Sequence, residues 1–294
     1  MAVALVVSVL PVFLFLGALV LLDSYKLITP RTILLAVAAG ATATVVGYVV
    51  NVSLIPALGL GIARYSKYVA PVVEELLKAT YIVWLLRRNK VGFVVDAAIY
   101  GFAVGTGFAF IENIYYLPVH PNPTIWTWIV RGFGTALMHG GTTAIFAMIS
   151  RTIQNRAPRF RLSLMIPGLA VAAMLHSLYN QFLVAPLLAT ALIVLVFPYI
   201  MMFLFQQSER ETRSWLGTGF DTDQELLRVM RAGQVSDTPV GSFLKGLRKS
   251  YQPEVIVDMM CLLRLRAELG IRAKGMLLMR EAGFEAEPDP SLRE

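Results

Sequence analysis

Two adjacent glutamates, Glu74 and Glu75, lie in the apolar stretch 68–84, which reads YVAPVVEELLKATYIVW and also contains Lys78. A charge at the centre of a membrane helix costs about 2.5 to 3.5 kcal/mol, so this concentration of charge needs an explanation. Lys78 follows Glu74 by four residues and Glu75 by three, a spacing at which a helix lets it neutralise one carboxylate. Two neighbouring carboxyl groups in a low-dielectric site do not both ionise easily. A carboxylate beside a carboxylic acid is suited to activating water.

Further polar side chains occur in separate apolar stretches, namely Glu112, Asn113, His139, His176 and Asn180. A helical rise of 1.5 Å per residue puts the glutamate pair, Glu112 and His176 in one layer, about 8 to 12 Å below the outer surface, with His139 somewhat deeper. His176 and Asn180 are four residues apart and share a helix face. Carboxylates for water activation, with imidazole and amide donors for an oxyanion, would make a hydrolytic site.

Two other interpretations of these residues stay open. Glu75, Glu112, His139 and His176 are of the types that bind Zn²⁺ with water in an open position, so a metal-dependent intramembrane hydrolase is one alternative. An ion-coupled transporter whose intramembrane carboxylates relay protons is the other. Against the transporter, the sequence has no visible inverted repeat and no matching pair of broken helices.

The elements that must position these residues are membrane helices. The 294 residues are 56% hydrophobic and 15% charged, with a mean hydropathy of +0.64, whereas soluble domains carry roughly 25% charged residues. We expect an all-α fold, a polytopic membrane helix bundle with a small helical cytosolic C-terminal domain. About seven stretches approach or exceed the roughly 20 residues needed to cross a bilayer, at 3–22, 33–55, 68–86, 93–117, 125–150, 164–184 and 186–205.

The composition changes abruptly at Gln206, which predicts a membrane domain over 1–205 and a cytosolic tail over 206–294. In the tail, the segment DTDQELLRVMRAG predicts a helix that begins with Asp221 as its N-cap and ends at Gly233. The tail contains no histidine, and its 13 basic and 14 acidic residues nearly cancel. The chain's basic surplus therefore lies before Gln206, mostly in short loops, as expected from membrane topology rather than from nucleic-acid binding.

The loop charges predict the orientation of the chain. One set of loops contains the basic residues Lys26, Arg31, Arg87, Arg88, Lys90, Arg151, Arg156, Arg159 and Arg161, whereas the opposite set has only Arg64 and Lys67. Loops rich in lysine and arginine stay in the cytoplasm. We therefore expect the N-terminus outside and the C-terminal tail in the cytoplasm.

Four segments, APVVEELLK, GFAVGTGFAFIENIYY, LMHGGTTAIFAM and LHSLYN, resemble the PrsW family of bacterial intramembrane proteases over about residues 68–182. That family is related to the CAAX-prenyl-protease and bacteriocin-processing group. The resemblance implies a multi-pass protein of the bacterial plasma membrane. It further implies a glutamic-type endopeptidase that cleaves single-pass or membrane-anchored proteins, as in site-1 cleavage of an anti-sigma factor, in the outer half of the bilayer. No cofactor is expected, with Zn²⁺ not excluded.

The same resemblance implies roles for individual residues. Glu74 and Glu75 match the Glu-Glu motif that activates water, and the related enzymes favour the first as base. Phe108-Ala-Phe-Ile-Glu112 matches a second motif, with Glu112 in place of the histidine of the CAAX enzymes, so His139 could supply the missing partner. His176 and Asn180 match the motif expected to position and polarise the carbonyl. Lys78, Asn113 and Phe108 would support the site.

Overall fold

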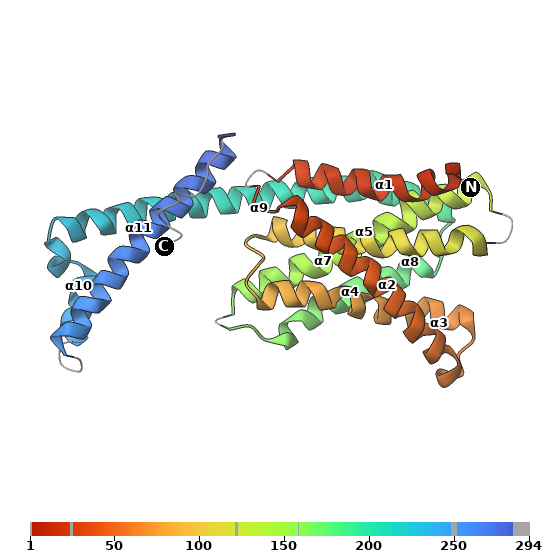
Figure 1. The fold of residues 1–294 in the computed structure, drawn as a ribbon, viewed down its shortest axis with the longest axis horizontal. Coiled ribbons are helices and arrows are strands. Elements are labelled where there is room, and N and C mark those ends of the chain that lie inside the picture. Colours follow the sequence, from red (N-terminus) through yellow and green to blue (C-terminus); the bar gives the residue numbers. More distant parts are fainter. Residues whose placement is uncertain (1, 24–25, 121–122, 158, 248–251, 285–294) are drawn as a thin grey trace. The chain divides into compact units, whose positions relative to one another are not determined.

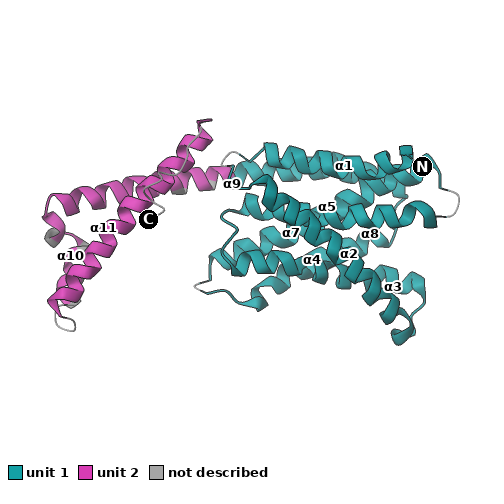
Figure 2. Cartoon of the chain, viewed as in Figure 1, with its two compact units in different colours: residues 1–208 teal, residues 209–294 magenta. Residues whose placement is uncertain are grey.

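The computed structural model describes the chain except residues 1, 24–25, 121–122, 158, 248–251 and 285–294. The described residues form helices and no strands, which confirms the all-α fold class. The chain divides into two compact units, Met1–Ser208 and Glu209–Glu294, which we call the membrane unit and the tail unit (Figure 2).

The membrane unit consists of helices and short helical turns (Figure 1). In chain order they are α1 (Ala2–Leu21), α2 (Pro30–Leu58), α3 (Ile62–Tyr68), α4 (Ala70–Arg87), α5 (Val94–Val119), α6 (Ile125–Ile129), the π-helical turn η1 (Val130–Thr135), α7 (Ala136–Asn155), the 3-10 turn η2 (Leu162–Met165), α8 (Ile166–Asn180) and the first part of α9 (Pro186–Arg231). Each of the seven expected apolar stretches is therefore largely helical.

Five segments in the described part of the chain are long and apolar enough to cross a membrane: α1, α2, α5, Leu162–Asn180 and α9. The chain is thus a multi-pass membrane protein. Helices α4 and α7 do not qualify by length and composition. In α4 the reason is its charge, since 18 residues include Glu74, Glu75, Lys78 and Arg87. The count of seven spans therefore stays a prediction.

Helix α5 is the centre of the membrane unit, packed against α1, α2 and α7 (Figure 1). In the most apolar stretch of α5, 78% of the residues are buried, against 17 to 28% in the other candidate spans. Glycines permit this close packing. A Cβ at Gly105 would collide with the carbonyl of His139 on α7, and one at Gly107 with the carbonyl of Val37 on α2. These contacts set the distance from α5 to the helices that carry site residues.

The run from α6 through η1 to α7 is continuous from Ile125 to Asn155, and its middle is π-helical. Such wide turns are rare and occur frequently at functional sites. This one brings Gly132 against the backbone of α1, where a Cβ would collide with the carbonyl of Val7. The same turn carries Arg131, the one charged residue of its sequence VRGFGT.

The tail unit contains the end of α9, the turn η3 (Gln234–Asp237), α10 (Pro239–Leu247) and α11 (Pro253–Glu281). The predicted helix end at Gly233 is confirmed, because α9 stops at Arg231 and Gly233 adopts a left-handed conformation with φ of 70°. The predicted start at Asp221 is wrong. Helix α9 passes through that position without interruption, since a residue that can cap a helix does not end one that is already formed.

Candidate active site

Glu75 lies at the meeting point of α4, α7 and α8. Its Oε1 atom accepts hydrogen bonds from Lys78 Nζ at 2.6 Å, Thr142 Oγ1 at 3.0 Å and His176 Nδ1 at 2.9 Å. The residue is only 2% exposed. This carboxylate is therefore charge-balanced by Lys78 and held in place by three donors, as a buried charge requires.

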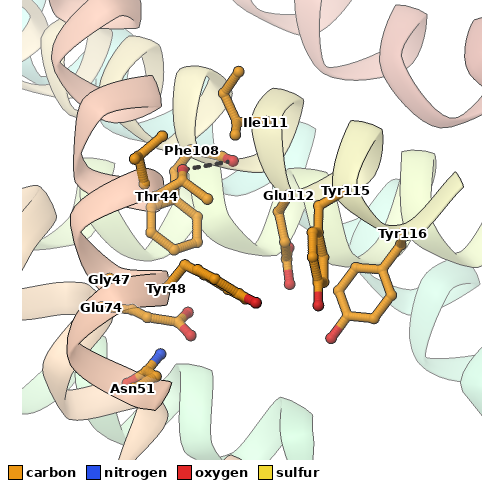
Figure 3. A pocket seen from close by; sticks show the side chains of 11 residues that line it. Thr44, Gly47, Tyr48, Asn51, Glu74, Phe108, Ile111, Glu112, Tyr115 and Tyr116 are labelled. Carbon is orange, nitrogen blue, oxygen red and sulfur yellow. Dashed lines mark hydrogen bonds between the residues drawn. The ribbon is translucent and has the colours of Figure 1, made fainter. Parts of the chain in front are cut away.

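Glu74 has different surroundings, because neighbouring residues on a helix do not face each other. Its carboxylate lines a cavity of about 290 Å³ between α2, α4 and α5 (Figure 3). Its Oε2 lies 3.8 Å from His176 Nε2, too far for a hydrogen bond. In Figure 3 the amide of Asn51 points toward it, and the hydroxyl of Tyr65 donates to Asn51 Oδ1 at 2.7 Å. Glu74 is thus the glutamate of the pair that can meet a reactant.

His176 connects the two glutamates. Nδ1 contacts Glu75 and Nε2 faces Glu74, and the ring is buried. When a neutral imidazole donates from Nδ1 to a carboxylate, the other nitrogen is left with a free lone pair. Glu75 therefore turns the basic nitrogen of His176 toward Glu74.

His139 packs edge-on against the ring of His176, with ring centroids 4.8 Å apart. Its Nδ1 lies 3.2 Å from Lys78 Nζ, and its Nε2 lies 3.0 Å from Glu112 Oε2. An ammonium group only donates, so Nδ1 accepts from Lys78 and Nε2–H donates to Glu112. The predicted supporting residue Phe108 packs beside both groups, with its ring 4.9 Å from that of His139 and 4.8 Å from Lys78 Nζ.

Glu112 is held from its other side by Arg131, with Nη2 3.4 Å from Oε2. Arg131 Nε donates to Asn113 Oδ1 at 2.8 Å, and Asn113 Nδ2 donates to the carbonyl of Ser8 at 2.6 Å. The guanidinium also lies over the ring of Tyr116, 4.0 Å from its centroid. Asn113 therefore joins α1, α5 and η1 around Glu112, one step away from the glutamate pair.

Asn180 is placed apart from these groups. Its amide donates to the carbonyl of Ser66 at 3.0 Å, and the nearby Ser177 hydroxyl donates to the carbonyl of Lys67 at 2.6 Å. Both bonds fasten α8 to α3. No hydrogen bond among the described residues joins Asn180 to the Glu and His cluster. The structure thus brings together every predicted catalytic residue except this one.

Three further residues belong to the site but do not appear in the sequence-based set: Asn51, Arg131 and Thr142. Arg131 had a signal, since it is a charge within an apolar stretch, as the glutamates are. Asn51 and Thr142 had none, because one polar neutral residue in a membrane helix is usually bonded within its own helix. Only the packing of α2 and α7 against α4 brings these two side chains to the glutamates.

The site also has donor atoms suited to a metal ion. Glu74, His139 and His176 each offer one ligand atom, and the three atoms lie within 4.8 Å of one another. Two imidazoles and a carboxylate are a ligand set of hydrolytic zinc sites, and a carboxylate behind a ligating histidine, as Glu75 is here, is its usual support. The residue types therefore fit a divalent cation, provided that one ring nitrogen of His139 gives up its contact with Lys78 or Glu112. The alternative metal-ligand set predicted from the sequence was Glu75, Glu112, His139 and His176. The two histidines remain in the structural set, but its carboxylate is Glu74 rather than Glu75 or Glu112.

A multi-pass helical bundle in which two buried imidazoles contact carboxylates, and Glu74 and Glu112 line a cavity, is a membrane protein with a site of the hydrolase type. The family model described as PrsW family intramembrane metalloprotease matches residues 29–205, more than half of the chain. The protein therefore belongs to the PrsW family and is an intramembrane protease, which confirms the resemblance. All the site residues fall inside the match. No curated protein and no solved structure matches the chain.

Proposed function

We propose that this protein hydrolyses peptide bonds of membrane-anchored proteins within the bilayer, with Glu74 as the base that activates water. One observation carries the assignment. Oε1 of Glu75 is engaged by Lys78, Thr142 and His176 at 2.6 to 3.0 Å, whereas Glu74 faces the cavity and lies 3.8 Å from His176. A general base must be free to reach the proton that it removes.

In this mechanism a water molecule lies between Glu74 and Nε2 of His176. Glu74 removes a proton while the water oxygen attacks the carbonyl carbon, and it returns the proton to the amine nitrogen as the carbon–nitrogen bond breaks. Because Nε2 of His176 carries no proton when Nδ1 donates to Glu75, His176 fits the orientation of water better than the oxyanion role. The Nε2–H of His139, now directed at Glu112, is the proposed donor for the carbonyl oxygen.

The neighbouring residues fix the protonation states and the positions of these catalytic groups. Lys78 balances Glu75 and keeps Nδ1 of His139 an acceptor, and Glu112 with Arg131 holds the other side of that ring. Asn180 fixes α8 and so has a positioning role. A divalent cation held by Glu74, His139 and His176 would, when bound, supply Lewis-acid activation of water. The family description favours testing for such a metal.

The proposed setting is the plasma membrane of a bacterium, with the N-terminus outside and the tail unit in the cytoplasm. The lysine and arginine distribution supports this orientation, and it puts the site in the outer half of the bilayer. Single-pass proteins, including a membrane-anchored anti-sigma factor, are the proposed substrates. Reporter fusions after Val119 and after Ser163 should report outside and inside, and the reverse pattern would overturn the depth of the site.

The mechanism can be tested by cleavage of a single-pass substrate in liposomes. Gln at position 74 keeps the side-chain shape but loses the base, so Glu74→Gln should lower the rate about 10² to 10⁴-fold. Glu75→Gln should lose activity mainly by leaving Lys78 unpaired, and adding Lys78→Met should restore part of it. Adding Lys78→Met to Glu74→Gln should restore nothing.

Two outcomes would change the assignment. If the Glu75→Gln, Lys78→Met double variant is inactive but folded, while Glu74→Gln keeps near-normal activity, Glu75 is the base. If a chelator abolishes cleavage by the unmodified protein and Zn²⁺ restores it, the site works through a bound metal. Metal content and chelator sensitivity should then both fall in His139→Asn and His176→Asn.

A further inference from the structure

The cavity in front of Glu74 has a wall of tyrosines that the catalytic mechanism does not use. Tyr48 comes from α2, and Tyr115 and Tyr116 come from α5, and their side chains reach into the same space as the carboxylates of Glu74 and Glu112 (Figure 3). The ring centroids of Tyr48 and Tyr115 are 5.3 Å apart, and those of Tyr115 and Tyr116 are 5.4 Å apart. The three rings therefore form one continuous aromatic wall.

From this wall we propose that the cavity is the subsite for one bulky, uncharged side chain of the substrate, next to the bond that is cut. The proposal rests on Glu74 being the group that activates water. Whole-ligand pockets are about 300 to 1,000 Å³. At about 290 Å³ this cavity is of a size for one or two side chains rather than for a helix. Its aromatic wall and the ring of Phe108 favour apolar or aromatic groups.

The charges around the cavity explain why the side chain must be uncharged. Glu112 is already matched by Arg131 and by the imidazole of His139, whereas Glu74 forms no ion pair with a lysine or arginine among the described residues. A lysine or arginine of the substrate would pair with Glu74 and occupy the base. An aspartate or glutamate would meet two carboxylates. An acidic side chain is therefore repelled from the cavity, and a basic one would bind unproductively because it blocks the base.

The cavity also has polar groups for an unwound peptide. A substrate helix must open locally before its carbonyl can be attacked, and in lipid each freed backbone group needs a new partner. The tyrosine hydroxyls and the Asn51 amide lie on the cavity side (Figure 3). Tyr48 and Tyr115 are 52% and 42% exposed in the isolated chain, so the wall is accessible from outside the bundle.

The test uses model substrates with one transmembrane segment, in which a single residue beside the cut bond is varied among Ala, Leu, Phe, Trp, Lys and Glu. Losing apolar contact in such a pocket lowers kcat/KM about 10 to 200-fold. The unmodified protein should therefore cut the Leu and Phe substrates about 10 to 200-fold faster than the Ala substrate, and the Lys and Glu substrates least. Tyr115→Ala should move the optimum toward Trp, while Tyr115→Phe should keep it.

Tyr199→Ala is the matched control, since Tyr199 is exposed on α9 and does not line this cavity. If Tyr115→Ala does not fold, Tyr48→Ala tests the same wall. Equal relative kcat/KM for all six substrates in both the unmodified protein and the Tyr variants would overturn the subsite. In that case an inactive Glu74→Gln still supports the proposed function. A shifted preference with an active Glu74→Gln would instead keep the subsite and refute the base.

Discussion

Charged residues are used differently in the two units of this chain. In the membrane unit, Glu75 and Lys78 pair at 2.6 Å with side chains 1% and 0% exposed. In the tail unit, Lys274 and Asp223 pair at 2.7 Å with side chains 16% and 25% exposed, and in the Arg228–Glu225 pair both side chains are mostly exposed. The distances are alike, but the surroundings are not.

The difference indicates what each set of charges is for. Taking two ions out of water costs more than their attraction commonly returns, so a buried pair is weak evidence for stability. Exposed pairs cost little and contribute about 0 to 1 kcal/mol each. The tail charges are thus a solvated surface with cross-helix pairs. The membrane charges persist at a cost, which is expected where the groups take part in chemistry.

Breaking one pair in each unit should give the largest contrast. Lys78→Met leaves Glu75 buried without its cation and should cost about 3 to 5 kcal/mol of stability. Arg228→Met breaks the exposed Arg228–Glu225 pair, which has nearly the same length of 2.8 Å, and should cost about 0 to 1 kcal/mol. Chemical unfolding of the two purified variants in detergent measures both. Equal losses would mean that Glu75 is stabilised by Thr142 and His176 without help from Lys78.

Glycines offer the next contrast, since some are in tight contact and others have open space. A Cβ at Gly105 would collide with the backbone of His139 and Gly140, while one at Gly217 in α9 would meet nothing within 4 Å. Gly105→Ala should therefore separate α5 from α7 at a cost of about 1 to 3 kcal/mol. Gly217→Ala should stabilise its helix by roughly 0.5 to 1 kcal/mol.

Activity gives a second measurement on the same two variants. Because His139 would move with α7, cleavage by Gly105→Ala should fall by more than its residual folded fraction explains. Gly217→Ala should cleave normally. Unchanged activity in folded Gly105→Ala would show that α5 and α7 can adjust without disturbing His139.

The sequence predicted those site residues whose burial in an apolar helix costs free energy. Glu74, Glu75, Glu112, His139 and His176 stand out because charges and imidazoles are rare in apolar stretches, and the structure brings all five together. The all-α fold follows from hydropathy. The tail helix end at Gly233 follows from one residue that takes a left-handed conformation easily.

Other features depend on packing and could not be predicted. The division of labour between Glu74 and Glu75 follows from which face of α4 meets α7 and α8, and one sequence leaves both orders open. The π-helical turn that carries Arg131 has no simple sequence signature. Asn180 shares a helix face with His176 by spacing, but the contact of α8 with α3 takes its amide to Ser66 instead.

The smallest effect should come from removing the tail unit. A chain that ends at Ser208 keeps residues 186–208 of α9, about as many as a membrane crossing needs. The matched family region ends at residue 205, and the tail contains no histidine. A chain ending at Ser208 should therefore cleave a model substrate in liposomes at a rate within a few-fold of the full chain. The full chain carrying Lys274→Met is the control, because it disturbs the tail without shortening α9. If the truncated chain is inactive although its unfolding transition is unchanged, the tail unit contributes directly to proteolysis, and its exposed charges need a functional explanation as well.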